Sequence, residues 1–259
     1  DEAEFPAMSA QDTARTLLRC LDLTSLNDGD TAESTAALCT KAQTAHGPVA
    51  AVCVWPRFVT QARAALPPAI RVAAVANFPE GALDLPRALA DIEAIAQAGA
   101  QEIDVVLPWR ALKSGQVQEV AEFLAEVRHA SRPLTLKVII ESGELKDEAL
   151  IRRATQLSLN AGADFIKTST GKTAVSATPE AARAMLDEIA HSGFSAAGFK
   201  ASGGIRTVAQ GADYLELVRA SLGEGGLHPQ RLRFGASGLL DDILAVLDGK
   251  AGTAVKEGY

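Results

Sequence analysis

Four ionisable side chains fall inside segments that are otherwise apolar. Asp104 lies among isoleucine and valine residues, Lys137 lies in a Leu/Val/Ile-rich run, and Lys167 and Lys200 each close a short apolar run. An ionised group in a core is costly unless it is paired, so any one of the four could instead be a rim residue in a salt bridge. Their recurrence in successive runs favours one shared site, because the ends of parallel barrel strands converge on a single mouth.

Neighbouring lysines in such a site would have a specific chemistry. Two adjacent ammonium groups repel each other and burial disfavours charge, so both effects lower the pKa of a lysine. A lysine with a lowered pKa is partly unprotonated and attacks carbonyl carbons. Lys167 and Lys200 are therefore a candidate Schiff-base pair, and Asp104 supplies a carboxylate for proton transfer. Spacing alone does not decide which lysine forms the imine.

Three glycine-containing segments indicate an anion site near these lysines. They are Thr168–Lys172, Ala201–Gly204 and Gly235–Gly238, and each follows an expected strand. Glycine lets backbone N–H groups approach a phosphate, and a helix that begins near Ser237 would add its N-terminal dipole. One such segment alone would be an ordinary turn. Together they favour a phosphorylated small substrate, because barrels commonly bind phosphate in the loops after their last strands.

Alternating short and long runs must position these residues. We expect strands at Leu21–Thr24, Val49–Val54, Arg71–Ala76, Glu102–Leu107, Thr135–Ile140, Asp164–Thr168, Ala196–Lys200 and Arg231–Gly235. We expect helices at residues 31–45, 57–65, 84–98, 111–130, 147–160, 179–191, 207–222 and 238–247, with an extra helix at 9–20. This rhythm predicts an α/β protein that is a single (β/α)8 TIM barrel with an extra N-terminal helix. The alternative is an open doubly wound sheet, which has the same local alternation.

The expected barrel domain covers residues 8–250, since no Pro/Gly/Ser-rich linker divides the chain. Residues 1–7 lack the basic and apolar regions of a signal peptide and precede Met8, so we expect a remnant of cloning or processing. Residues 251–259 are small and polar and predict a flexible C-terminal tail. Within it, Tyr259 is more simply a frayed end than a cover for the barrel mouth.

The composition excludes several classes of partner. With 47% hydrophobic and 22% charged residues, the chain is typical of soluble globular proteins. The 25 Lys+Arg against 32 Asp+Glu residues leave a net charge of −7, which argues against nucleic acid as a partner. The longest apolar run near the start, Val49–Trp55, is too short to span a membrane, so no membrane partner is expected.

Cysteine and histidine patterns argue against metal sites. Cys20, Cys39 and Cys53 are an odd number without CxxC spacing, which predicts a reduced, cytoplasmic protein without disulfides or structural zinc. The four histidines show no ligand spacing, so no metal site is expected. Cys53 is most simply a buried small hydrophobe. The acidic run from Glu141 to Glu148 is interpreted as mostly a solvated loop and helix start.

The same residues carry a resemblance to a known family. Phe165–Lys172 (FIKTSTGK) is similar to the Schiff-base segment of the deoxyribose-phosphate aldolases. The likeness continues, in order, through Leu21–Thr24, Cys53–Phe58, Asn77–Pro79, Glu102–Val106, Lys137–Glu141, Gly198–Lys200, Gly203–Arg206 and Arg233–Ser237. It covers nearly the whole chain from about residue 15 to residue 247. The Lys167 segment with Asp104 and Lys200 is highly specific, whereas the glycine pairs alone are not.

The resemblance implies a class I aldolase that needs neither a metal nor an organic cofactor. Such enzymes reversibly cleave 2-deoxy-D-ribose 5-phosphate into acetaldehyde and D-glyceraldehyde 3-phosphate, in deoxynucleoside catabolism. It implies that Lys167 forms the imine, that Lys200 lowers the pKa of Lys167, and that Asp104 takes part in proton transfer through a water. The residues implied for the substrate and phosphate sites are Asp22, Thr24, Cys53, Lys137, Thr170, Gly171, Lys172, Gly203, Gly204, Ser237 and Gly238.

This chain departs from the resemblance at Ala201-Ser202, a change that we expect to be tolerated, and at Gly238. Many relatives have a second serine where this chain has Gly238, which puts the phosphate affinity in doubt but leaves the backbone N–H in place. A related class I aldolase with another donor, or a catalytically silent barrel that binds a phosphosugar, would share many of these residues. A homo-oligomer, with a dimer favoured, is expected because two-fold dimers are the commonest oligomers.

Overall fold

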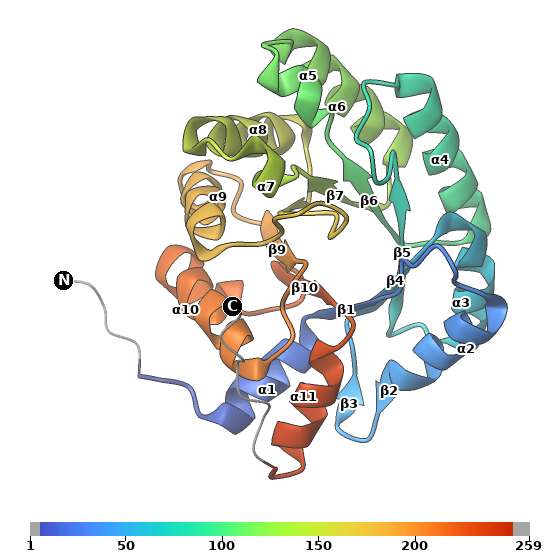
Figure 1. Ribbon diagram of the computed structural model, residues 1–259, viewed down its shortest axis with the longest axis vertical. Helices are drawn as coiled ribbons and strands as arrows, with labels where there is room; N and C mark the ends of the chain where they lie inside the picture. Colours follow the sequence, from blue (N-terminus) through green and yellow to red (C-terminus); the bar gives the residue numbers. More distant parts are fainter. Residues whose placement is uncertain (1–5, 251–259) are drawn as a thin grey trace.

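Eight parallel strands close into a barrel in the computed structural model, which describes residues 6–250 (Figure 1). Around the barrel each strand pairs in parallel with its two neighbours, and β1 meets both β4 and β10. This closure confirms the predicted TIM barrel and excludes the open sheet. The strands are β1 (Leu21–Thr24), β4 (Ala51–Val54), β5 (Arg71–Ala76), β6 (Glu102–Val106), β7 (Thr135–Ile139), β8 (Phe165–Lys167), β9 (Gly198–Ser202) and β10 (Leu232–Ala236).

Helices form the outer layer of the barrel (Figure 1). The predicted extra helix is α1 (Ala10–Arg19), which packs against α10 and α11. The other helices are α2 (Ala32–Lys41), α3 (Val59–Ala65), α4 (Leu85–Ala98), α5 (Trp109–Lys113), α6 (Val117–Ser131), α7 (Ser142–Leu145), α8 (Glu148–Ala161), α9 (Pro179–His191), α10 (Val208–Leu222) and α11 (Leu239–Leu247). Two short 3-10 helices, η1 (Pro56–Phe58) and η2 (Glu224–Gly226), complete the set for the described residues.

Local sequence signals explain where several helices begin and end. Thr178 caps α9 by accepting a hydrogen bond from the backbone N–H of Ala181, and Pro179 takes the first helical position. Gly99 and Gly162 end α4 and α8 with φ of 99° and 98°, a conformation that side chains beyond glycine rarely adopt. These caps turn the chain back toward the next strand.

Several predicted elements differ from the structure by two residues or more, including the strand expected at Val49–Val54, which begins at Ala51. The expected helix 111–130 is divided into α5 and α6, because Gly115 adopts φ of 84° between them. The expected helix 31–45 ends at Lys41, and the hairpin of β2 (Gln43–Thr44) and β3 (Gly47–Pro48) follows, because Gly47 takes φ of 115°. The strand expected at Ala196–Lys200 begins two residues later, because Ala197 N–H donates to Phe194 O and holds this segment in a turn.

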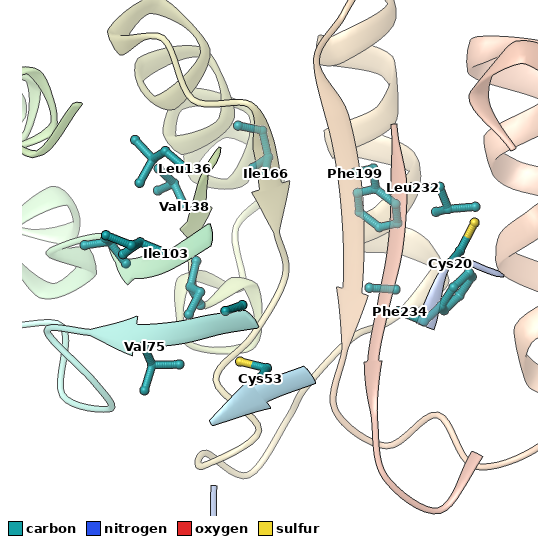
Figure 2. Packing of buried hydrophobic residues seen from close by; sticks show 14 of the residues in the cluster. Cys20, Cys53, Val75, Ile103, Leu136, Val138, Ile166, Phe199, Leu232 and Phe234 are labelled. Carbon is teal, nitrogen blue, oxygen red and sulfur yellow. The ribbon is translucent and has the colours of Figure 1, made fainter. Parts of the chain in front are cut away.

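Alternation along the strands separates an apolar face from a charged one. Side chains such as Ile103, Val138, Ile166 and Phe199 are fully buried and project from successive strands into the layer between barrel and helices (Figure 2). The residues between them on the same strands face the barrel interior, because successive side chains of a strand point to opposite faces. The interior of this barrel is therefore where the charged residues of the strands meet.

Residues 1–5 of the expected remnant, and all of the expected tail 251–259 with Tyr259, lie outside the described residues. Among the described helices, none is long and apolar enough to cross a membrane.

Candidate active site

Strand register brings the predicted charged residues together inside the barrel. Lys167 on β8 is the direct partner of Lys200 on β9, and Asp104 on β6 is the direct partner of Lys137 on β7. Arg233 on β10 lies opposite Lys200 on its other side. Because paired residues of parallel strands share a face, all five side chains point into the same interior. Lys200 therefore lies in the middle of its strand and not at the strand end that the sequence suggested.

Seven side chains form one buried group, which we call the ion-pair cluster. Asp104 is its centre, since one oxygen, Oδ2, accepts from Lys167 Nζ at 3.0 Å and from Lys200 Nζ at 2.9 Å. Its other oxygen accepts from Lys137 Nζ at 2.8 Å. Each member is nearly or fully inaccessible to solvent. The members are Asp22, Glu102, Asp104, Lys137, Lys167, Lys200 and Arg233.

The charges of the ion-pair cluster balance when one lysine is neutral. Its three carboxylates can pair with three cations, but the cluster holds three lysines and one arginine. Burying an excess charge is expensive, so one lysine is favoured to lose its proton. Arginine does not lose its proton in proteins, which leaves the three lysines as candidates.

The pKa shifts select Lys167 as that lysine. Burial lowers the pKa of Lys167, and the Lys200 ammonium lowers it further, although Asp104 acts in the opposite direction. Burial also acts against the charge of Lys137 and Lys200, but their neighbouring carboxylates outweigh it and raise the pKa of both. Burial alone would raise the pKa of Asp104, yet the three ammonium groups around it hold that pKa well below its usual value. Asp104 is thus ionised and Lys167 is the member poised to be neutral.

A cavity of about 230 Å³ opens at the carboxyl ends of the strands, directly over Lys167. Neither Lys137 nor Lys200 reaches its wall, so Lys167 connects the ion-pair cluster to the cavity. Besides Lys167, the wall carries the cationic side chains of Lys172 and Arg206 and no carboxylate, in a chain with a net charge of −7. The lining residues are Thr24, Ser25, Leu26, Asn27, Lys167, Thr170, Gly171, Lys172, Ser202, Gly203, Gly204, Ile205, Arg206, Gly235, Ala236, Ser237 and Gly238.

Backbone geometry makes one end of the cavity suited to an anion. Gly171, Gly203 and Gly204 have φ of 79°, 86° and 79°, which places them in the left-handed region and leaves successive N–H groups free to turn toward a ligand. Ser237 and Gly238 immediately precede α11, whose N-terminal dipole favours negative charge. The side chains of Lys172 and Arg206 add positive charge at the rim. This end can therefore hold a phosphate group.

The structure divides the predicted site residues into two groups. Nine of the fourteen line the cavity, and they are Thr24, Lys167, Thr170, Gly171, Lys172, Gly203, Gly204, Ser237 and Gly238. The other five lie behind the wall, and they are Asp22, Cys53, Asp104, Lys137 and Lys200. Asp22 and Lys137 belong to the ion-pair cluster, where Lys137 Nζ lies 3.1 Å from Asp22 Oδ2. Burial and then the Asp104 carboxylate raise the pKa of the Cys53 thiol, so Cys53 is a buried neighbour of the cluster.

One interpretation of the sequence is wrong at Glu141. It is fully buried and not part of a solvated run. Its carboxylate accepts from Thr170 N at 3.1 Å and from Thr170 Oγ1 at 2.7 Å, and Thr170 Oγ1 in turn accepts from Lys172 N at 3.0 Å. Glu141 thus braces the loop that carries Thr170, Gly171 and Lys172. The sequence signal for its burial was its position directly after an apolar strand. The same pattern identified Lys167.

Sequence reasoning also gave no role to Glu102, Arg233 and Arg206. Glu102 precedes Asp104 by two residues, so the period of a strand puts both on the interior face. Arg233 precedes Gly235 by the same spacing on the last strand. Period-two alternation could have found both of these residues. Arg206 gave no such signal, because it lies in a loop and reaches the cavity only through the path of that loop.

A parallel barrel with a buried, pKa-lowered lysine under a cavity at its carboxyl end is the architecture of a class I aldolase. Residues 16–244 match the model of the DeoC/LacD family aldolases. The chain is 48% identical over 252 residues to a curated deoxyribose-phosphate aldolase of Agrobacterium fabrum, covering 96% of this chain and 97% of that protein. The chain belongs to the DeoC/LacD aldolase family.

Solved structures agree with this assignment. A crystal structure from Toxoplasma gondii ME49, of a protein assigned as a deoxyribose-phosphate aldolase, matches with a TM-score of 0.84 at 28% identity. The match covers 93% of this chain and 96% of that chain. A second such protein, from Coccidioides immitis, matches with a TM-score of 0.78 at 29% identity, covering 92% of this chain and 87% of that one.

Proposed function

We propose that this aldolase reversibly cleaves 2-deoxy-D-ribose 5-phosphate into acetaldehyde and D-glyceraldehyde 3-phosphate. The family, the 48% identical Agrobacterium relative and the cationic cavity support this substrate. A phosphate at the glycine-lined end would leave the sugar to extend toward Lys167, which lines the same cavity. The reaction needs neither a metal nor an organic cofactor, because the protonated imine is itself the electron sink.

Lys167 is the proposed imine-forming residue, and one observation carries this assignment. Of the three buried lysines, it alone lines the cavity, and it alone has a lowered pKa. A nucleophile must be both unprotonated and accessible to the carbonyl carbon. Lys137 and Lys200 meet neither condition, because carboxylates hold them in the charged form behind the wall.

The chemistry follows from this arrangement. The neutral Nζ of Lys167 attacks the aldehyde carbon of the open-chain sugar, and uptake of one proton with loss of water gives a protonated imine, the proton being released again when the final imine is hydrolysed. Removal of the C3 hydroxyl proton breaks the C2–C3 bond, releases glyceraldehyde 3-phosphate, and sends the electron pair through C2 into the imine to give an enamine. Protonation of the enamine at C2 and addition of water then release acetaldehyde and the free lysine.

We assign Asp104 to proton transfer in these steps, and we assign Lys200 to provide a fixed positive charge beside Lys167. Asp104 Oδ2 accepts hydrogen bonds from both Lys167 and Lys200, so a single carboxylate oxygen links the nitrogen that forms the imine to the Lys200 ammonium group. Lys200 keeps its own proton because Asp22 Oδ2 also lies 2.7 Å from its Nζ. Its fixed positive charge disfavours protonation of Lys167 between turnovers.

Trapping the imine tests this proposal. The protein is incubated with acetaldehyde and reduced with borohydride, and its peptides are mapped by mass spectrometry. An ethyl adduct on Lys167, absent in Lys167→Ala, is expected. An adduct on Lys137 or Lys200 would overturn the assignment of Lys167, and no adduct on folded protein would overturn the Schiff-base mechanism. Formation of glyceraldehyde 3-phosphate from deoxyribose phosphate tests the substrate itself.

Assembly and location belong to the same proposal. We propose a homodimer on the general frequency of two-fold dimers, and light scattering that shows only monomers would reject it. We also propose a cytoplasmic enzyme. Its three cysteines are free and buried among the described residues, as suits a reducing compartment, and fractionation of the source cells tests it.

A further inference from the structure

A second buried pair lies at the amino-end side of the ion-pair cluster, away from the substrate cavity. Glu102 and Arg233 face each other through two parallel contacts, with Arg233 Nη1 at 2.7 Å from Oε1 and Nη2 at 2.9 Å from Oε2. Glu102 is fully buried and Arg233 is 4% exposed. Neither lines the cavity above Lys167. The mechanism proposed above uses neither of them.

Short ion pairs link this pair to Lys167. Lys137 Nζ lies 2.7 Å from Glu102 Oε1 and 2.8 Å from Asp104 Oδ1, and Asp104 Oδ2 is 3.0 Å from Lys167 Nζ. Glu102 is therefore at most about 11 Å from Lys167, allowing about 2 Å for the width of the Asp104 carboxylate. The side chains along this path are buried, and only its far end, at Glu102, borders an open cavity at the amino ends of the strands, so water screens the path little near Lys167.

Arg233 is linked to Lys167 by a second path on the other side of the barrel. Arg233 Nη1 lies 3.0 Å from Asp22 Oδ1, and Asp22 Oδ2 lies 2.7 Å from Lys200 Nζ. Lys200 then shares Asp104 Oδ2 with Lys167. The Glu102–Arg233 pair thus contacts Lys137 on one path to Lys167 and Asp22 on the other.

We propose that Glu102 and Arg233 are positioning residues that set, by their opposite charges, the pH at which Lys167 becomes reactive. The inference rests on the proposed function, because it takes Lys167 as the imine-forming lysine. Glu102 favours the charged form of Lys167 and Arg233 favours the neutral form. With both present, their effects on the protonation of Lys167 offset each other. The charge of Lys200 then has the larger influence on whether Lys167 is neutral.

The other charged and titratable groups around Lys167 come from separate strands and from the buried Glu141 after β7, whose pKa is raised by burial and lowered in part by Lys167. Asp104 on β6 favours its charged form, whereas Lys200 on β9 and Lys137 on β7 disfavour it. The Cys53 thiol on β4 also faces it, and this thiol stays neutral because burial raises its pKa. These groups remain in place when the Glu102–Arg233 pair is changed.

The pair itself has three further charged neighbours. Asp22 on β1 and Lys137 on β7 are members of the cluster. Arg71 on β5 places its Nε 2.6 Å from Glu102 Oε2, but its side chain is 42% exposed. Water reaches Arg71 and screens its charge, so it contributes less to the field at Lys167 than Arg233 does. This difference provides a matched control.

Each charge should move the titration of Lys167 by about one pH unit, because a unit charge about 11 Å away (Glu102) or about 14 Å away (Arg233) at an effective dielectric constant of about 20 changes a pKa by about that much. Glu102→Gln removes a negative charge, so the pKa of Lys167 falls and the reaction extends to lower pH. Arg233→Met removes a positive charge, so the pKa of Lys167 rises and the reaction requires higher pH. The double variant restores the balance.

The experiment measures the rate of imine formation with acetaldehyde against pH, with a borohydride quench and detection of the Lys167 peptide. Acetaldehyde has no titratable group in this range, so the acidic limb reports the protein. We expect the limb to move down by about one unit in Glu102→Gln and up by about one unit in Arg233→Met. It should return to the wild-type position in the double variant and move much less in Arg71→Met.

Each other outcome has a defined meaning. Limbs that move in the same direction, that do not move, or that stay displaced in the double variant would overturn the proposal, since loss of structure alone has no such sign pattern. If one single variant does not fold, the other single variant and the double variant still test the sign. An adduct on a lysine other than Lys167 in the wild-type protein would instead reject Lys167 as the imine-forming residue of the proposed function, which separates the two failures.

Discussion

Replacing Lys200 with methionine removes the ammonium group that shares Asp104 Oδ2 with Lys167. Methionine keeps an unbranched chain of similar size, so the barrel interior stays filled. The carboxylates of Asp22 and Asp104 keep cationic partners, because Lys137 lies 3.1 Å and 2.8 Å from them. The change therefore alters the field at Lys167 more than it alters the packing.

Its magnitude follows from the geometry of the shared oxygen. The two Nζ atoms lie 2.9 and 3.0 Å from Asp104 Oδ2, so they are separated by no more than about 6 Å. At an effective dielectric constant of about 20, two such charges repel by about 3 kcal/mol, which corresponds to about two pKa units. Without Lys200 the pKa of Lys167 should rise by about that amount. The neutral fraction of Lys167 at pH 7 would then fall about a hundredfold.

The assay is the rate of borohydride-trapped imine formation with acetaldehyde, followed from pH 6 to about 10. The rate of Lys200→Met should be about a hundredfold lower at neutral pH and should approach the wild-type rate at high pH. Lys41→Met, which removes an exposed lysine at the end of α2, is the control and should leave the profile in place. An unchanged acidic limb, or an equal loss at every pH, would refute the view that Lys200 tunes Lys167 by its charge.

Three further predictions concern the support of the site. Glu141→Ala removes two buried hydrogen bonds to Thr170, so KM for deoxyribose phosphate should rise several-fold while kcat changes less. Steady-state kinetics in which kcat falls and KM is unchanged would contradict the role of Glu141 in holding the Thr170 loop. Gly235→Ala would bring a Cβ to 3.0 Å from Lys200 Cε, and denaturant unfolding should show a loss of about 1–3 kcal/mol. Folding lowers the pKa values of the three carboxylates of the ion-pair cluster. The stability that they contribute is therefore present above about pH 4 and is lost as the pH falls further. A free energy of unfolding that stays constant below about pH 4 would refute this prediction.

Much of the candidate active site was predictable from the sequence because its signals are local. Ionisable residues inside apolar runs identified Asp104, Lys137, Lys167 and Lys200, and all four are buried in the ion-pair cluster. Gly171 was predicted to belong to an anion site, and it has a positive φ and lines the cavity. A lone charge in an apolar strand and a glycine in a turn can each be recognised from the few residues around them.

Contacts across the barrel were not predictable in this way. Glu141 was interpreted as solvated because it begins a run of charged residues, yet its partner Thr170 is 29 residues away. Arg233 and Glu102 are 131 residues apart, and Lys200 and Asp22 are 178 apart. These pairs depend on how β1 and β10 meet when the barrel closes.

The sequence by itself determined the alternation of strands and helices, the charged residues of the barrel interior and the glycine-containing loops that line the cavity. These depend on backbone preferences and on the period of a strand, which short segments express on their own. Only the tertiary structure decided that Lys167 reaches the cavity while Lys137 and Lys200 lie behind its wall, and that Glu102 and Arg233 complete the charge balance. The pKa of a buried group depends on every charge within about 10 Å, and barrel closure alone brings those charges together.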